Sequence, residues 1–153
     1  MSAMVVLAIA SAAHATATSR ADRVYPYSFA HYDCAPWDGP AIGLVLRKAA
    51  TPLVTFQTLP PDTYPQVVVT LYMRHPPVNS WIALPGLGMK EGGGYLNECL
   101  QRGHCANKQG RIKFVRASDN HLDGELRIQA EGTGREIVLP FAAPILPFQA
   151  ICG

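Results

Sequence analysis

The sequence has few charged residues and lacks the pattern of an amphipathic helix. Only 16% of its 153 residues are charged, and the net charge of +2 is too small to indicate a nucleic acid or membrane partner. Beyond the N-terminal region, no 11-residue window places apolar residues at positions i, i+3, i+4 and i+7. The composition is instead 48% hydrophobic, with 13 glycines and 13 prolines. This composition is typical of one compact, turn-rich β-domain.

The sequence also lacks the motifs of common enzymes. It has no Gly-x-Ser-x-Gly elbow, and its glycine clusters do not lie between a strand and a helix, as a phosphate loop would. The histidines outside the N-terminal region have no metal-ligand spacing; they are His31, His75, His104 and His121. No cofactor or metal is therefore predicted. Two carboxylate pairs are present, Asp33 with Asp38 and Asp123 with Glu125, but turn caps and solvated side chains explain them better than catalysis.

The first 17 residues resemble a secretory signal peptide. A short apolar run from Met4 to Ala10 precedes two Ala-x-Ala sites, which end at Ala15 and Ala17. The run is too short for a transmembrane anchor. A lipid anchor is disfavoured, because no cysteine lies near the Ala-x-Ala sites. The alternative is a buried strand or helix of the folded domain. We expect a signal at 1–17 and a single β-domain at 18–153, periplasmic or secreted.

The four cysteines fit an exported chain, because disulfides persist in oxidising compartments. We expect Cys99 to pair with Cys105 as a short clip, and Cys34 to pair with Cys152, so that the second bond ties the start of the domain to its end. The rival interpretation is a metal site. However, the spacing from Cys99 to Cys105 is wider than that of structural zinc ligands.

The residues from 110 to 129 carry the clearest structural signal. Two runs of alternating residues flank a cluster of turn-forming residues, which predicts a β-hairpin with one apolar face. The apolar face carries Ile112, Phe114, Leu126 and Ile128, and the other face carries Arg111, Lys113, Val115, Glu125, Arg127 and Gln129.

Further strands are predicted at 27–32, 41–47, 54–58, 66–74, 80–84 and 135–141. The 66–74 strand is apolar on both faces, as a central strand would be. Pro140 places the last strand at a sheet edge or breaks it. Between residues 75 and 109 we expect mostly irregular structure, with a turn of helix near 95–100. The fold class is therefore an all-β antiparallel sandwich or barrel of seven to eight short strands, held by disulfides.

Several short motifs are similar to those of small exported bacterial β-domains of unknown function. They are Asp33-Cys34-Ala35-Pro36 with Asp38-Gly39-Pro40-Ala41, then Gly110-x-Ile112-x-Phe114, Gly124-x-Leu126 and Arg135-Glu136-Ile137. The resemblance implies an exported protein of a Gram-negative bacterium and brings no catalytic residue with it.

One run of cations is the best candidate for a binding site. Five of the 13 cations lie between residues 102 and 116 with no acid among them, namely Arg102, Lys108, Arg111, Lys113 and Arg116. Arg127 on the partner strand extends the run. Arg116 has the inward parity of Phe114, so it joins the patch only if the strand ends or bulges near Val115. The alternative is a solvated strand face that keeps the sheet soluble.

The leading hypothesis is an exported binding protein, such as an inhibitor or immunity-type protein of the bacterial envelope. Its partner would be an acidic protein or an anionic envelope glycan, and not a nucleic acid. One alternative is a small secreted hydrolase that uses loop carboxylates near 33–38 and 75–109. Another is a structural accessory subunit.

The signal-peptide interpretation predicts the mature N-terminus. Protein purified from its native compartment is expected to begin at Thr16 or Thr18, because cleavage follows an Ala-x-Ala site. N-terminal sequencing checks this, and an intact Met1 would contradict it.

Overall fold

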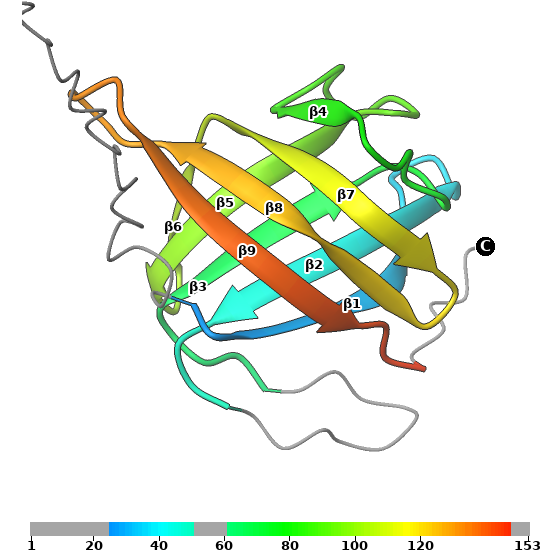
Figure 1. The fold of residues 1–153 in the computed structure, drawn as a ribbon, viewed down its shortest axis with the longest axis horizontal. Helices are drawn as coiled ribbons and strands as arrows, with labels where there is room; N and C mark the ends of the chain where they lie inside the picture. The colour runs from blue at the N-terminus through cyan, green and yellow to red at the C-terminus, as the bar shows by residue number, and fades with distance from the viewer. Residues whose placement is uncertain (1–24, 51–60, 148–153) are drawn as a thin grey trace, which may run out of the picture.

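The computed structural model describes residues 25–50 and 61–147, and within these ranges the chain is all-β, with no helix. Figure 1 shows its nine strands. They are β1 (Tyr27–Cys34), β2 (Pro40–Arg47), β3 (Gln66–Leu71), β4 (Trp81–Leu84), β5 (Gly94–Gln101), β6 (His104–Asn107), β7 (Gly110–Ser118), β8 (His121–Gln129) and β9 (Glu136–Pro144).

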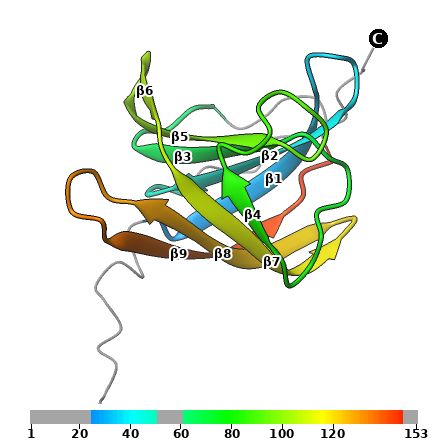
Figure 2. The same ribbon diagram turned by 90° about the horizontal axis from the view of Figure 1, so that it is seen from above.

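The strands form two antiparallel sheets that pack face to face, as Figure 2 shows. One sheet has five strands in the order β1-β2-β3-β5-β6, and the other has four in the order β4-β7-β8-β9. The predicted all-β antiparallel sandwich is therefore confirmed. As predicted from Pro140, β9 lies at the edge of its sheet, where a missing backbone N–H is tolerated.

Backbone hydrogen bonds tie the two sheets together at both sides. Beyond the end of β9, the Leu146 N–H donates to the Ala30 carbonyl of β1 at 2.8 Å. On the other side, Gly86 and Gly94 exchange N–H···O bonds of 3.2 and 3.0 Å. A Cβ at Gly94 would lie 2.5 Å from the Thr70 carbonyl oxygen, so only glycine allows this close approach.

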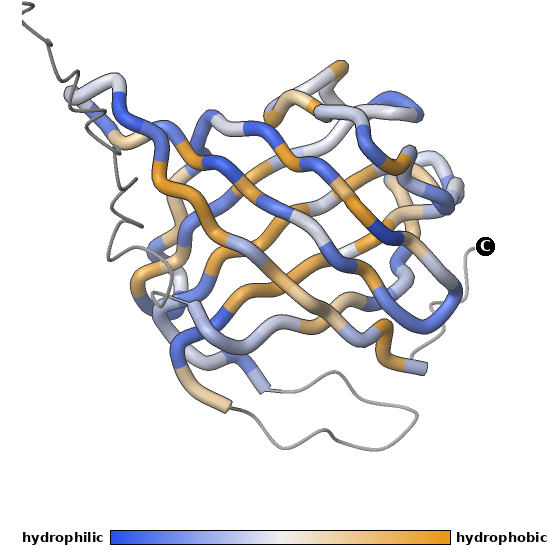
Figure 3. The backbone as a smooth tube through the Cα atoms, in the orientation of Figure 1, coloured by the Kyte–Doolittle hydropathy of each residue, from blue (hydrophilic) through white to orange (hydrophobic). Residues whose placement is uncertain are grey.

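The core fills the space between the sheets. Its buried residues come from alternate positions of β2, β3, β7, β8 and β9, with one residue each from β1, β4 and β5. Figure 3 shows the resulting alternation of hydropathy along the chain. In β2, Ile42, Leu44 and Leu46 point inward as predicted, each at most 1% exposed. In β3, Val67, Val69 and Leu71 are fully buried at the centre of the five-stranded sheet.

The predicted hairpin is confirmed as β7 and β8, which pair in antiparallel register. Ile112, Phe114 and Leu126 are fully buried, and Ile128 is 5% exposed. The Phe114 ring meets the Phe141 ring of β9 edge to face, with centroids 5.7 Å apart. The hairpin therefore supplies much of one wall of the core.

The prediction for residues 75–109 is wrong in two respects. The expected turn of helix near 95–100 is strand β5, and β6 follows it, so the irregular segment is much shorter. Leu96 is the inward apolar residue of β5, but the polar residues Asn97 and Glu98 follow it and interrupt the apolar–polar alternation that predicts a strand. Pairing of β5 with β3 imposes the strand, and that contact is not local in sequence.

The other expected strands stand as follows. Those at 27–32, 41–47, 66–74, 80–84 and 135–141 correspond to β1, β2, β3, β4 and β9. The strand expected at 54–58 lies outside the described residues. The described ranges hold nine strands rather than seven or eight because β5 and β6 were missed.

The predicted Cys99–Cys105 disulfide is confirmed and joins opposed residues of the β5–β6 hairpin, with Cα atoms 4.0 Å apart. Cys34 is also disulfide-bonded. Its expected partner, Cys152, lies outside the described residues.

The structure predicts a large difference between two adjacent positions of β7. Phe114→Ala is expected to lower the free energy of unfolding by about 3–5 kcal/mol, because it empties a fully buried aromatic site. Lys113→Ala, on the outer face, is expected to cost about 1 kcal/mol or less, because it removes only a contact with an exposed ring. Denaturant melts measure both values, and the reverse order would contradict the register.

His31 is a buried titratable group on the outer face of β1. It is 8% exposed, and its ring lies so close to Gly43 of β2 that a Cβ there would be 2.4 Å from the ring. Burial lowers the pKa of His31, and the charge of Asp33 opposes that shift only in part.

This lowered pKa predicts a loss of stability in acid. As the pH falls below the ordinary histidine pKa of 6.5, His31 becomes protonated in the unfolded chain while it stays neutral in the folded chain. Protonation therefore favours the unfolded chain, and the free energy of unfolding falls until the pH reaches the folded pKa. The denaturation midpoint is expected to drop between pH 7 and pH 5, and to drop less in His31→Asn. His104→Gln, at an exposed position, should keep the wild-type slope. Equal slopes in wild type and His31→Asn would contradict this assignment.

Candidate functional site

Four of the six predicted cations meet on the outer face of the four-stranded sheet. Arg111 and Lys113 project from β7 and Arg127 projects from β8, all with the parity opposite to the buried residues. We call this surface the cationic face. It comprises Trp81, Arg111, Lys113, Arg116, Asp123, Glu125, Arg127 and Glu136.

Arg116 reaches the cationic face through a bulge. The register of β7 against β8 shifts between Phe114 and Arg116, so that Arg116 pairs with Asp123 and the following Ala117 returns to the inner side. Val115 is left 55% exposed. The condition stated for Arg116 is thereby met, because a bulge places two successive residues on one side of the strand.

Trp81 of β4 is the centre of the cationic face, and no motif or spacing in the sequence marks it as a site residue. The Arg111 and Arg127 guanidinium carbons lie 4.7 and 4.9 Å from the centroid of its ring, and the Lys113 Nζ lies 5.0 Å away. Each distance is within the range of a cation–π interaction. Trp81 remains 37% exposed. Three cationic side chains therefore pack over one aromatic ring that is still accessible to solvent.

Carboxylates neutralise most of these cations. Glu136 accepts from Arg111 at 3.0 Å and from Arg127 at 3.4 Å, while Glu125 accepts from Arg127 Nε at 2.6 Å. The hydrogen bond from Arg111 lowers the pKa of Glu136, and the bond to Glu125 raises the pKa of Arg127.

Arg116 pairs with Asp123, whose other oxygen contacts His121 Nε2 at 2.7 Å. Four cations against three carboxylates leave one net positive charge on the cationic face. Lys113 is the cation on this face that has no ion pair among the described residues.

The two remaining predicted residues lie elsewhere. Lys108 sits at the corner where the chain passes from β6 to β7, and its Nζ is 2.7 Å from Glu131 and 3.6 Å from Glu98. The hydrogen bond to Glu131 raises the pKa of Lys108. Arg102 occupies the exposed turn between β5 and β6. The six cations therefore do not form one patch.

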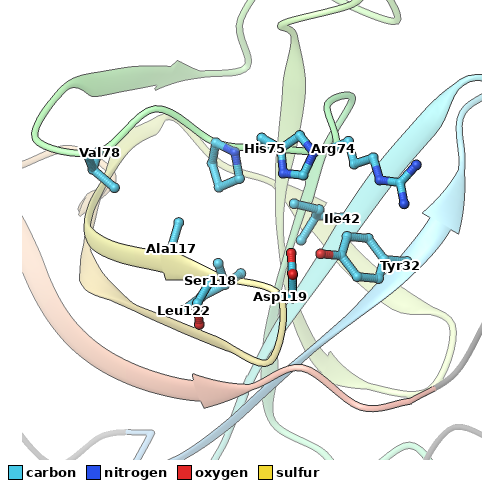
Figure 4. Close-up of a pocket in the computed structure, with 10 residues that line it drawn as sticks. Tyr32, Ile42, Arg74, His75, Val78, Ala117, Ser118, Asp119 and Leu122 are labelled. Atoms are coloured by element: carbon cyan, nitrogen blue, oxygen red, sulfur yellow. The ribbon is translucent and has the colours of Figure 1, made fainter.

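A second candidate site is a cavity of about 150 Å³ at one open end of the sandwich. Its lining comes from three parts of the chain: β1 and β2, the segment after β3, and the β7–β8 turn (Figure 4). The lining residues are Tyr32, Ile42, Arg74, His75, Pro76, Val78, Ala117, Ser118, Asp119 and Leu122.

This cavity contains a serine, a histidine and an aspartate, but not in a catalytic arrangement. The Ser118 hydroxyl donates to Asn120 Oδ1 at 3.0 Å and contacts the His121 carbonyl at 3.1 Å, so it serves the β7–β8 turn. Within the described ranges, no hydrogen bond joins His75 to Ser118 or to Asp119. A nucleophile must be in hydrogen-bond reach of its base, and this geometry does not provide it.

Three of the four carboxylates considered for hydrolysis have structural partners, namely Asp33, Asp123 and Glu125. Asp33 accepts from the Cys34 N–H at 2.8 Å, and Asp38 occupies the β1–β2 turn with a φ of 62°. Asp123 and Glu125 belong to the ion pairs of the cationic face. In residues 25–50 and 61–147, no three potential metal ligands lie together, and no helix is long and apolar enough to cross a membrane.

Comparisons of this chain with protein-family models, with curated proteins and with solved structures find no match.

Proposed function

We propose that this protein is an exported binding protein whose cationic face binds an anionic polysaccharide. The observation that carries the proposal is the accessible Trp81 ring held by Arg111, Lys113 and Arg127. A sugar ring has an apolar face of C–H groups that can pack on an indole, and the surrounding guanidinium and carboxylate groups can bond to its hydroxyls.

The geometry of the cationic face suits such a ligand. Trp81 stands on a strand that is paired along its length with β7, and its cationic neighbours belong to the same sheet. Binding would therefore cost little ordering of the protein. Among the described residues Lys113 has no ion pair, so its charge is available to a sulfate, phosphate or carboxylate on the polysaccharide.

Two features support export. An apolar run with Ala-x-Ala sites begins the chain, and the Cys99–Cys105 disulfide suits an oxidising compartment. Envelope and extracellular spaces are rich in anionic polysaccharides, and a cationic surface there would meet such polymers.

The proposal is tested by measuring affinity for dextran sulfate, with uncharged dextran and polyglutamate as comparison ligands. Trp81→Ala is expected to weaken dextran sulfate binding by about tenfold, because it removes the stacking surface. Lys113→Gln should weaken binding by several-fold at low salt and less at high salt, since salt screens exposed charges.

Arg102→Gln is the matched control, because it removes an exposed cation that lies outside the cationic face and, like Lys113, has no ion pair within residues 25–50 and 61–147. It should leave the affinity nearly unchanged. If Arg102→Gln and Lys113→Gln lowered the affinity for dextran sulfate equally, the net charge of the protein, and not the cationic face, would explain the binding. Polyglutamate binding that depends on Trp81 as strongly as dextran sulfate binding does would favour an acidic protein partner and contradict the polysaccharide.

A further inference from the structure

The outward side chains of β7 and β8 continue beyond the cationic face to the closed end of their hairpin (Figure 1). Four outward-facing pairs follow one another along the two strands: Arg111 with Arg127, Lys113 with Glu125, Arg116 with Asp123, and Ser118 with His121. His121 precedes the buried Leu122, so it faces the same side of the sheet as the cationic face. The hairpin therefore adds a histidine to this surface.

Asp123 connects His121 to Arg116. One of its carboxylate oxygens lies 2.7 Å from His121 Nε2, and the other pairs with Arg116 Nη2. The side chain of Arg116 is 65% exposed and that of His121 is 31% exposed, so a ligand can reach both. A guanidinium has five N–H donors, and the contact with Asp123 leaves donors of Arg116 for a second anion.

Few other charges lie near His121. Within the described residues, the neighbouring strands and turn place three charged side chains around it, namely Arg116 of β7, Asp119 of the β7–β8 turn and Asp123 of β8. On the other side of β8, the paired residues of β9 are the uncharged Ala142 and Pro144. Asp119 lines the cavity with Arg74, His75 and the inward-facing Leu122, whereas His121 faces outward.

The protonation of His121 sets the charge of this group. With His121 neutral, the charges of Arg116 and Asp123 cancel, and with His121 protonated, two cations face one carboxylate. Histidine ordinarily gains its proton as the pH falls below about 6.5, while carboxylates ordinarily stay ionised to about pH 4. Mild acid therefore adds one positive charge to the closed end of the hairpin.

A polymer can contact this group and Trp81 at the same time. Trp81 pairs with Lys113, which lies opposite Glu125 on β8. His121 is four residues from Glu125 on the same strand, which corresponds to about 13 Å. A single sugar stacked on Trp81 is too short to reach His121, whereas a polysaccharide chain that lies along the hairpin can do so.

We propose that Arg116 and His121 form a second anion subsite of the cationic face, which strengthens polysaccharide binding in mild acid. Arg116 and protonated His121 bind a sulfate, phosphate or carboxylate group of the polysaccharide, and Asp123 positions both side chains. This inference rests on the proposed function and adds the residue through which pH acts on it.

The test compares the affinity for dextran sulfate at pH 7.5 and pH 5.5, both at low salt. Sulfate groups keep their charge over this range, so a change in affinity arises in the protein. Wild type is expected to bind about three- to fivefold more tightly at pH 5.5, which is the effect of one added exposed ion pair. His121→Gln should lose most of this gain. His121→Arg, which is charged at both pH values, should bind at pH 7.5 about as tightly as wild type binds at pH 5.5.

Arg116→Gln should weaken binding at both pH values by several-fold, because the arginine is charged throughout. His104→Gln is the control, since it removes an exposed histidine of β6 that lies outside the cationic face, and it should keep the wild-type gain. NMR spectra at both pH values show whether each variant is folded, which separates this effect from the acid destabilisation assigned to His31.

Three results would overturn the subsite and leave the proposed function standing, provided that Trp81→Ala still weakens binding. They are an equal gain in wild type and His121→Gln, an equal loss of the gain in His104→Gln and His121→Gln, or wild-type affinity in Arg116→Gln at both pH values. No binding of dextran sulfate at either pH would contradict the subsite and the proposed function together.

Discussion

The burial of the β7–β8 hairpin against the five-stranded sheet is the constraint on which the outer surface depends. Phe114 and Leu126 are fully buried, and strand side chains alternate between faces. Once these residues face inward, Arg111, Lys113 and Arg127 must face outward on adjacent strands. A slip of one residue would bury three cations, at a cost that no core could offset. The register that makes the core therefore also makes the cationic face.

Apolar and polar residues alternate within β7 and β8, so the hairpin and its two faces could be predicted from the sequence. The same alternation showed that Arg116 could reach the polar face only through a bulge near Val115. The same rule identified the inward face of β2. It failed for β5, because Asn97 and Glu98 interrupt the apolar pattern and the strand is imposed by pairing with β3. Local pattern reveals a strand where one face is uniformly apolar, and conceals it where neighbouring strands supply the stability.

The candidate sites were harder to derive, because both depend on contacts between distant segments. A run of cations in sequence was a guide to Lys113 and Arg127, but it also included Lys108, which turns away at the β6–β7 corner to meet Glu131. Trp81 joins the cationic face only because β4 pairs with β7, about thirty residues later in the chain. No spacing rule connects those positions before the sheet is known.

The closure of the sandwich explains why its cavity lies at an end. Leu146 and Ala30 seal one side with a backbone hydrogen bond, and the paired Gly86 and Gly94 tie the other. Along the sheets themselves, the apolar side chains interdigitate and leave the cavity no room. At the ends, connecting segments replace strands, and their polar residues need not face inward or outward in alternation. Asp119 can therefore stand beside the buried Leu122, which places charged groups at the edge of an apolar core.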